Sequence, residues 1–207
     1  FAASIAVIAA IAAVANGGIL YARGLGSDAL PDKTDTAVRV MTWNTAGAAT
    51  DARLIAQTAI AMQADVVALP ETTIETGEAV AVAMREMGSP MWAHHEAYPG
   101  WAANSTTLLI SPQLGDYAVV QSTSGGTSNT ATVPTVVAMP VDGTGPTIVA
   151  AHAVAPRPDD MEHWRESLQW LADQCASDSV IMAGDFNATV DNMDRLGVDG
   201  ADLGLCR

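Results

Sequence analysis

The chain has 207 residues, which is enough for one α/β domain with its own hydrophobic core and a short appendage. Its 9 Lys and Arg residues against 23 Asp and Glu residues leave a formal charge of −14, and the cations are scattered without a basic run or stripe. Binding along a nucleic-acid duplex depends on clustered cations. The composition therefore argues against extensive duplex contact unless metal ions supply the positive charge.

The first 22 residues, Phe1–Ala22, carry no charge. As a helix this run would extend over about 33 Å, close to the thickness of a bilayer's hydrocarbon core. Tyr21 and Arg23 end the run, as is typical of a membrane interface. We therefore predict a transmembrane helix over residues 1–23; a buried core helix and the apolar region of a signal peptide are the alternatives.

A polar linker with Gly, Pro and Asp follows over residues 24–36, and we predict one domain over residues 37–207. The chain begins with Phe1 inside an apolar run and ends soon after "GADLGLC". We expect from this that the domain is incomplete at its C-terminal end.

Two cysteines, Cys175 and Cys206, occur without a CxxC pair or a Cys/His cluster, so they do not predict a metal site. One disulfide in an oxidising compartment and two buried free thiols both fit this pair. A disulfide would favour a domain outside the cytoplasm.

Helical patterns flank the predicted domain at both ends. One begins at an Asp51 cap and runs to about Gln63, a second carries apolar residues at 3–4 spacing, and a third runs from about Pro158 to Ala176. Apolar runs between and around them predict strands: Val38–Trp43, Asp65–Leu69, "STTLLIS", "DYAVVQS", "ATVPTVVAMP", Thr147–His152 and Val180–Ala183. The pattern indicates an α/β or α+β domain in which helices cover two packed sheets.

Four of the predicted strands end in polar side chains that can bind a metal ion or a phosphate. These are Asn44, Glu71, His152, and the pair Asp185 and Asn187. Each alone has an ordinary explanation, such as a turn, a solvated loop or a half-buried histidine. Because ligands of α/β sheets bind at the carboxyl ends of the strands, the five together predict one site.

The segment "VIMAGDFNAT", residues Val180–Thr189, allows two local conformations. If the strand continues past Gly184, Asp185 and Asn187 point to the same side of it. A turn formed by Gly-Asp-x-Asn explains the same letters equally well.

The segments "RVMTWNTAG", "DVVALPETT", "TIVAAHAVAP" and "VIMAGDFNAT" resemble, in order, motifs of the endonuclease/exonuclease/phosphatase superfamily of metal-dependent phosphoesterases. The resemblance covers most of Val38 to Thr189, and the His-Ala-x-x-Pro form around His152 is similar to the deoxyribonuclease branch. It implies a four-layered α/β/β/α sandwich.

The resemblance also implies a role for each site residue. Glu71 would be the principal Mg²⁺ ligand, with Asn44 beside it. Asp185 would orient or deprotonate the attacking water, while Asn187 would hold a phosphoryl oxygen and His152 would donate to the phosphate. Mg²⁺ prefers oxygen ligands, and Mn²⁺ accepts the same ones.

One motif of the superfamily, a late Ser/Thr-Asp-His, has no match in this sequence. The remaining histidines, His94, His95 and His163, lie too early in the chain to supply it. We attribute the difference to the expected truncation, which would also leave the last sheet incomplete.

These observations predict a membrane-anchored enzyme, with its domain outside the cytoplasm, that hydrolyses a phosphoester, preferably a phosphodiester, with Mg²⁺. The acidic chain favours a small or lipid phosphoester over duplex DNA. The alternative is a non-catalytic module that uses the same site only to bind a ligand; all five motif residues are present, which favours the enzyme.

Overall fold

The computed structural model describes residues 2–22, 30–120, 129–175 and 179–188. The chain divides into two compact units, Phe1–Asp35 and Thr36–Arg207. The predicted boundary between helix and linker at residues 23 and 24 lies outside the described residues. Residue 206, the second cysteine of the possible disulfide, also lies outside them.

The first unit contains helix α1, Ala2–Ala22, which carries no acidic or basic residue. The side chains of its residues 3–21 are exposed. Among the described residues, α1 is the one helix that is long and apolar enough to cross a membrane, over Ala3–Tyr21 with a mean hydropathy of 2.1. The predicted apolar helix is therefore present.

The second unit contains two four-stranded sheets. Their strands are β1 (Val40–Thr42), β2 (Val66–Pro70), β3 (Trp92–Ala97), β4 (Ser105–Ile110), β5 (Tyr117–Val119), β6 (Val136–Pro140), β7 (Thr147–His152) and β8 (Val180–Asp185). The strand order is β1-β2-β4-β3 in one sheet and β5-β6-β7-β8 in the other. Only the β1–β2 and β7–β8 pairs are parallel.

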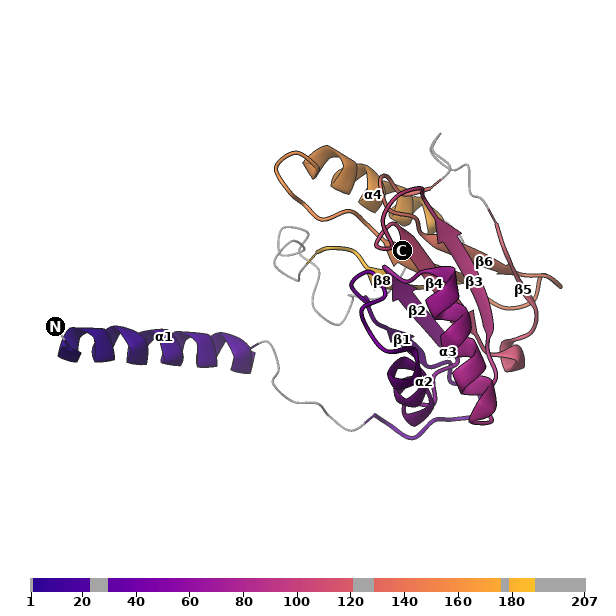
Figure 1. The fold of residues 1–207 in the computed structure, drawn as a ribbon, viewed down its shortest axis with the longest axis horizontal. Helices are drawn as coiled ribbons and strands as arrows, with labels where there is room; N and C mark the ends of the chain where they lie inside the picture. Colours follow the sequence, from indigo (N-terminus) through magenta and orange to yellow (C-terminus); the bar gives the residue numbers. More distant parts are fainter. Residues whose placement is uncertain (1, 23–29, 121–128, 176–178, 189–207) are drawn as a thin grey trace. The chain divides into compact units, whose positions relative to one another are not determined.

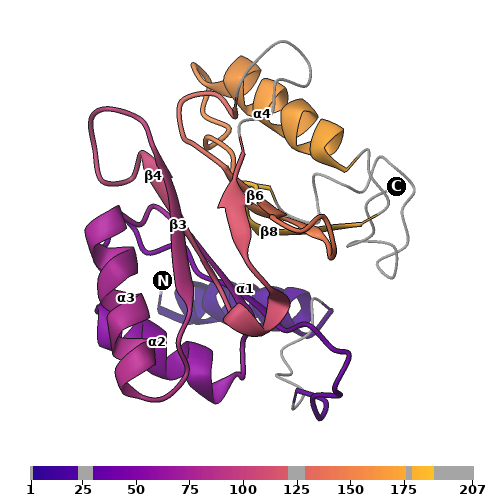
Figure 2. The same ribbon diagram turned by 90° about the vertical axis from the view of Figure 1, so that its right-hand side faces the viewer.

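Helices cover the outer faces of both sheets (Figures 1 and 2). On the first sheet lie α2 (Ala52–Ala61) and α3 (Ile74–Glu86), and on the second lies α4 (Met161–Gln174). The predicted cap of α2 is confirmed, because the Asp51 carboxylate accepts the Leu54 N–H at 3.0 Å.

Successive side chains of a strand point to opposite faces of its sheet. This alternation divides the buried apolar side chains into three layers, one between the two sheets and one between each sheet and its helices. In β2, Val67 and Leu69 pack against α2 and α3, whereas Val66 and Ala68 face the second sheet. Trp170 and Leu171 of α4 cover the far side of that sheet. The order helix, sheet, sheet, helix confirms the predicted four-layered α/β sandwich.

Strand β3 was not among the predicted strands. Its sequence "WAHHEA" lacks an apolar alternation, and its residues are exposed or partly exposed. It lies at the edge of the first sheet and pairs only with β4. Pro70, predicted to follow the second strand, is the last residue of β2.

Candidate functional site

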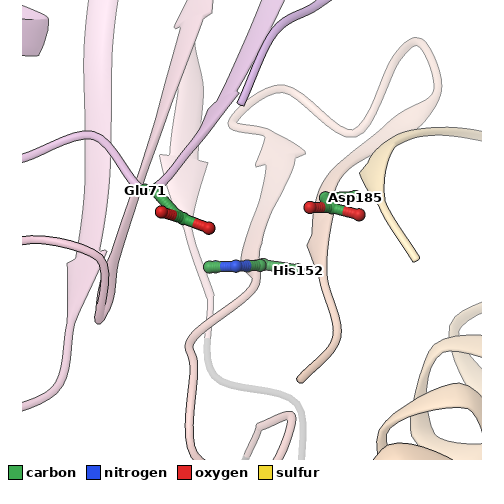
Figure 3. A group of neighbouring side chains, drawn as sticks. All are labelled: Glu71, His152 and Asp185. Carbon is green, nitrogen blue, oxygen red and sulfur yellow. The ribbon is translucent and has the colours of Figure 1, made fainter. Parts of the chain in front are cut away.

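The parallel pairs of the two sheets lie against each other, because β1 and β2 contact β8 and β2 contacts β7. Glu71 follows β2, while His152 and Asp185 end β7 and β8 as register partners. One ligand atom from each of these three side chains lies within 4.8 Å of the other two. Figure 3 shows the three side chains as neighbours. Two carboxylates and an imidazole at this spacing fit a divalent cation.

Asn44 joins the two carboxylates. Its Nδ2 donates to Glu71 Oε1 and to Asp185 Oδ2, both at 2.8 Å, and its Oδ1 accepts the Ala46 N–H at 2.9 Å. In this arrangement the amide nitrogen, and not the oxygen, faces the carboxylates. Ligation of a cation by Asn44 stays a prediction and needs a different rotamer.

After β8 the chain forms a turn, which is the second of the two conformations that the sequence allows for Gly-Asp-x-Asn. The Asp185 Oδ1 accepts the Asn187 N–H at 2.8 Å, and Asn187 has a left-handed φ of 46°. Asn187 Nδ2 then donates to the Ala153 carbonyl at 2.7 Å. A side-chain turn of this kind is characteristic of Asp and Asn, and it brings Asn187 to Ala153, the residue that follows β7.

Gly184 allows β8 to approach β7 at the site. A Cβ at this position would overlap the backbone carbonyl and amide of Ala151, and the φ of Gly184 is +155°. Trp164 of α4 holds the following turn by donating its Nε1–H to the Phe186 carbonyl at 3.0 Å. The position of Asp185 therefore depends on a glycine and on a helix of the outer layer.

Glu71 is held in a left-handed backbone conformation with a φ of 56°, which is costly for a residue with a Cβ. The buried Thr45 hydroxyl donates to the Glu71 carbonyl at 2.8 Å, and the Ala48 N–H donates to the same oxygen at 2.9 Å. Thr72, also buried, contacts the Thr45 hydroxyl at 2.8 Å. These bonds fix the direction in which the Glu71 side chain leaves the backbone.

His152 is 2% exposed, and its burial lowers the pKa of its imidazole. The negative charges of Asp185 and Glu71 oppose this shift and favour the protonated ring. The net direction is downward, so burial outweighs the two carboxylates.

The hydrogen-bond partners of Thr106 decide the tautomer of His152. The Thr106 hydroxyl lies 2.6 Å from the Pro134 carbonyl, which can only accept, and 3.2 Å from His152 Nδ1. Because the hydroxyl carries one proton and donates it to Pro134, it accepts from Nδ1–H. The neutral ring therefore has its free lone pair on Nε2, the nitrogen left for a cation or a substrate.

A cavity of about 700 Å³ opens beside these side chains. Glu71, His152 and Asn187 line it, together with Trp101, Asn104, Asp160, Arg157 and residues of the 132–133 and 153–155 segments. A volume of this size suits a small-molecule ligand.

All five predicted residues are thus neighbours, but sequence reasoning missed the threonines that position them. Thr45 and Thr72 each directly follow a predicted site residue, which is a weak signal, whereas Thr106 gives none. His163 Nδ1 lies 3.9 Å from a carboxylate oxygen of Asp160, and His95 Nδ1 lies 3.1 Å from the Thr107 hydroxyl.

The fold is an α/β sandwich of two sheets, and carboxylates, an imidazole and amides lie together at its strand ends. This combination is typical of phosphoesterases. The model of the Endonuclease/Exonuclease/phosphatase family matches residues 41–203, and the chain belongs to this family. The family resemblance in the sequence is thereby confirmed.

Solved structures show the same fold at low sequence identity. D. rerio TDP2 complexed with single strand DNA product has a TM-score of 0.56 and 16% identity, covering 79% of this chain and 66% of that one. For an AP endonuclease from Archaeoglobus fulgidus the TM-score is 0.52 at 14% identity, with 76% and 63% covered.

A family protein from Leptotrichia buccalis gives a TM-score of 0.54 at 14% identity, with 77% of this chain and 72% of that one covered. The chain thus spans about two thirds of the length of these structures. Among curated protein sequences, none matches the chain.

Proposed function

We propose that this protein is a divalent-metal-dependent phosphodiesterase in which a water attacks phosphorus in line with the leaving oxygen. Membership of the family supports hydrolysis of a phosphoester. The observation that carries the proposal is the cluster of Glu71, His152 and Asp185 within 4.8 Å at the strand ends.

In this proposal Glu71 holds Mg²⁺, for which Mn²⁺ can substitute, and Asn44 lies beside it. When bound, the cation neutralises negative charge that develops on the phosphoryl oxygens. Its preference for oxygen agrees with the carboxylates of Glu71 and Asp185, whose charges would otherwise repel a phosphate.

The side chains carry the remaining steps. Asp185 accepts a proton from the attacking water, its direction being set by the bonds from Asn44 and from the Asn187 amide. Asn187 contacts a phosphoryl oxygen without adding charge. His152 donates to the phosphate through Nε2 in its protonated form, which a bound anion favours over the neutral ring.

For the substrate, we propose a small or membrane-lipid phosphoester in preference to duplex DNA. The formal charge of −14 without a basic stripe supports this choice, because backbone contacts to a duplex need clustered cations. We also propose that α1 anchors the chain, with the domain outside the cytoplasm, where Cys175 and Cys206 could pair.

Hydrolysis of bis(p-nitrophenyl) phosphate, plasmid DNA and a phospholipid panel by the full chain in detergent tests the function. We expect Mg²⁺-dependent turnover that EDTA abolishes and that Asp185→Ala lowers at least about 100-fold, the usual contribution of a general base. Asp116→Asn, an exposed position before β5, serves as the control and leaves the rate unchanged.

Turnover that persists in EDTA, or full activity in Asp185→Ala, would contradict the assigned roles. Binding of phosphate without any turnover would support the non-catalytic alternative instead. Preferential cleavage of the plasmid would reject the proposed substrate class.

A further inference from the structure

We propose that β3 is the surface through which two copies of this chain form a dimer. The two β3 strands pair antiparallel about a two-fold axis that passes between His95 and its counterpart in the second copy. The first sheet of one copy then continues into the first sheet of the other. This inference does not depend on the proposed hydrolysis.

The outer edge of β3 carries backbone groups that point away from the sheet. The Tyr98 N–H donates to the Asn104 carbonyl at 2.8 Å, which continues the pairing of β3 with β4 by one residue. Because bonded residues alternate in an antiparallel pair, every second residue of β3 directs its N–H and C=O to β4. The others direct theirs outward: Ala93, His95 and Ala97.

Strand β3 lacks the features that usually keep an edge strand from pairing. Its sequence "WAHHEA" contains neither Pro nor Lys, and its register with β4 runs without a bulge from Trp92 to Ala97. In Figure 2 this edge faces the viewer, and no helix lies in front of it. By these criteria β3 is open to the addition of another strand.

One face of β3 carries aromatic and ionisable side chains. Trp92 lies opposite Ile110 of β4, which belongs to the apolar layer between the two sheets. Side chains at every second position share a face. His94, Glu96 and Tyr98 therefore lie on the same face as Trp92.

Glu96 and His94 are both half-buried without a partner. Burial raises the pKa of Glu96, and its carboxylate has neither an ion pair nor a hydrogen bond within the described ranges. His94 Nε2 is buried and also lacks a hydrogen-bond partner. A carboxylate and an imidazole held in this way are both stabilised when they meet across an interface.

Pairing about His95 brings these groups together. Ala93 of one strand lies opposite Ala97 of the other, so that all outward residues exchange their backbone hydrogen bonds. His94 lies opposite Glu96 of the second copy, and the two-fold axis repeats this pair. Such positions do not exchange backbone bonds, and their Cα atoms are about 4.5 Å apart, which brings the side chains close.

The same register places Trp92 opposite Tyr98 of the second copy. Cross-strand aromatic pairs stabilise neighbouring strands, and Trp92 is 56% exposed in the single chain. With the axis at Glu96 instead, the two Glu96 carboxylates would repel each other, and with the axis at His94, Glu96 would lie opposite Trp92. The side chains thus favour one register over its neighbours.

At the axis, the two His95 rings lie on the opposite face of the strand. Burial lowers the pKa of His95, so the two rings carry no charge near pH 7 and do not repel each other. Each ring keeps its contact with the Thr107 hydroxyl, at 3.1 Å from Nδ1.

Sedimentation velocity of the full chain in detergent, over a range of protein concentrations, tests the dimer. We expect a reversible equilibrium of monomer and dimer. A chain that stays monomeric up to about 100 μM would overturn the proposal. Helix α1 is the same in every variant below, so association of α1 in detergent cannot produce differences among them.

Disulfide formation tests the register. His95→Cys places two thiols at the axis with Cα atoms about 5.5 Å apart, a distance that a disulfide can bridge. Ala93→Cys points to the same face, but its two copies lie about 13 Å apart. After mild oxidation we expect a linked dimer of His95→Cys, and for Ala93→Cys no more than the wild-type chain shows. Equal linkage of both variants, or none, would contradict the register.

The aromatic pair is tested by Trp92→Ala, which should raise the dissociation constant of the dimer about 10-fold, because both copies of the pair are lost. Leu54→Ala is the matched control. Leu54 is 49% exposed but lies on α2, and its loss should leave the dimer unchanged. Equal effects of the two variants would overturn the interface.

The charged pair is tested by exchange. His94→Glu places carboxylates opposite each other and Glu96→His places imidazoles opposite each other, so each should weaken the dimer about 10-fold. The double variant restores opposite partners and should return to within about 3-fold of the wild type. A folded double variant without recovery would show that these side chains do not meet.

Glu96→Gln preserves the shape of the side chain and provides the measurement if the exchanged variants fail to fold. It should weaken the dimer about 3-fold, and an unchanged dissociation constant would contradict the pair. None of these measurements involves turnover, so the dimer can fail while the proposed function stands, and the reverse.

Discussion

At the scale of single residues, the hydroxyl of Thr106 determines which nitrogen of His152 is available. Thr106 is fully buried, and its one proton goes to the Pro134 carbonyl. Nδ1 must then donate to it. A threonine thus orients the imidazole, and its hydroxyl leaves Nε2 free to act.

Replacing Thr106 tests this arrangement. Thr106→Val preserves the shape but leaves the Pro134 carbonyl and Nδ1–H without a partner, at a cost of about 1 to 3 kcal/mol in the free energy of unfolding. We expect the ring to redistribute between its two neutral tautomers, which imidazole ¹⁵N chemical shifts of the labelled full chain would report.

Thr106→Ser keeps the hydroxyl and should therefore keep the wild-type ¹⁵N shifts. If Thr106 acted only through packing, the loss of its methyl group would be expected to change them. Unchanged shifts in Thr106→Val would contradict the assigned tautomer.

At the scale of elements, the predictions succeeded where local chemistry acts alone. The cap at Asp51 determines where α2 begins, and the buried runs in β2 and β7 identify both strands. The sequence did not predict strand β3, because an edge strand needs no continuous apolar face and the segment "WAHHEA" has none. Its identity as a strand comes from the pairing with β4.

Gly184 of β8 shows how a single element depends on its neighbour. Gly184→Ala would push a methyl into the backbone of Ala151, and we expect a loss of about 2 kcal/mol or more in the free energy of unfolding. The displaced Asp185 should also lower the rate of hydrolysis.

Gly88→Ala is the matched control for this variant. Gly88 also has a positive φ, but nothing lies within 4 Å of its added Cβ, so only backbone strain of about 1 kcal/mol is expected. Urea unfolding of the three proteins measures the difference. Equal losses in both variants would show that strand approach is not what requires Gly184.

At the scale of the whole molecule, the proposed anchoring of the chain by α1 can be tested by membrane extraction. If α1 spans a membrane, the full chain should stay in the membrane fraction after extraction with alkaline carbonate. Placing aspartates in the span, as in the double variant Ile8→Asp and Ile11→Asp, should release it, since each charge costs about 3 kcal/mol at the bilayer centre.

Mass spectrometry of the N-terminus distinguishes a membrane anchor from a signal peptide. A signal peptide would be removed, and alkaline carbonate would then extract the remaining chain. Protease digestion of intact and of lysed cells measures the orientation. Protection of the domain in intact cells would contradict an extracytoplasmic location.

The sequence by itself determined the layered α/β class, the apolar N-terminal helix and the five polar strand ends. The period of apolar residues decides which faces are buried, and a polar residue that follows a buried strand is visible in the letters alone. It left two conformations open after Gly184, because Asp and Asn suit an extended strand end and a turn equally.

Only the tertiary structure decided which atoms meet. Asn44 and Asp185 are 141 positions apart, and their hydrogen bond exists because two separate sheets pack with their parallel strands together. The same packing places Thr106 against His152, and Trp101 and Arg157 around one cavity. The local pattern of apolar and polar residues specifies which faces are buried. It does not specify the distance between residues that lie on different sheets.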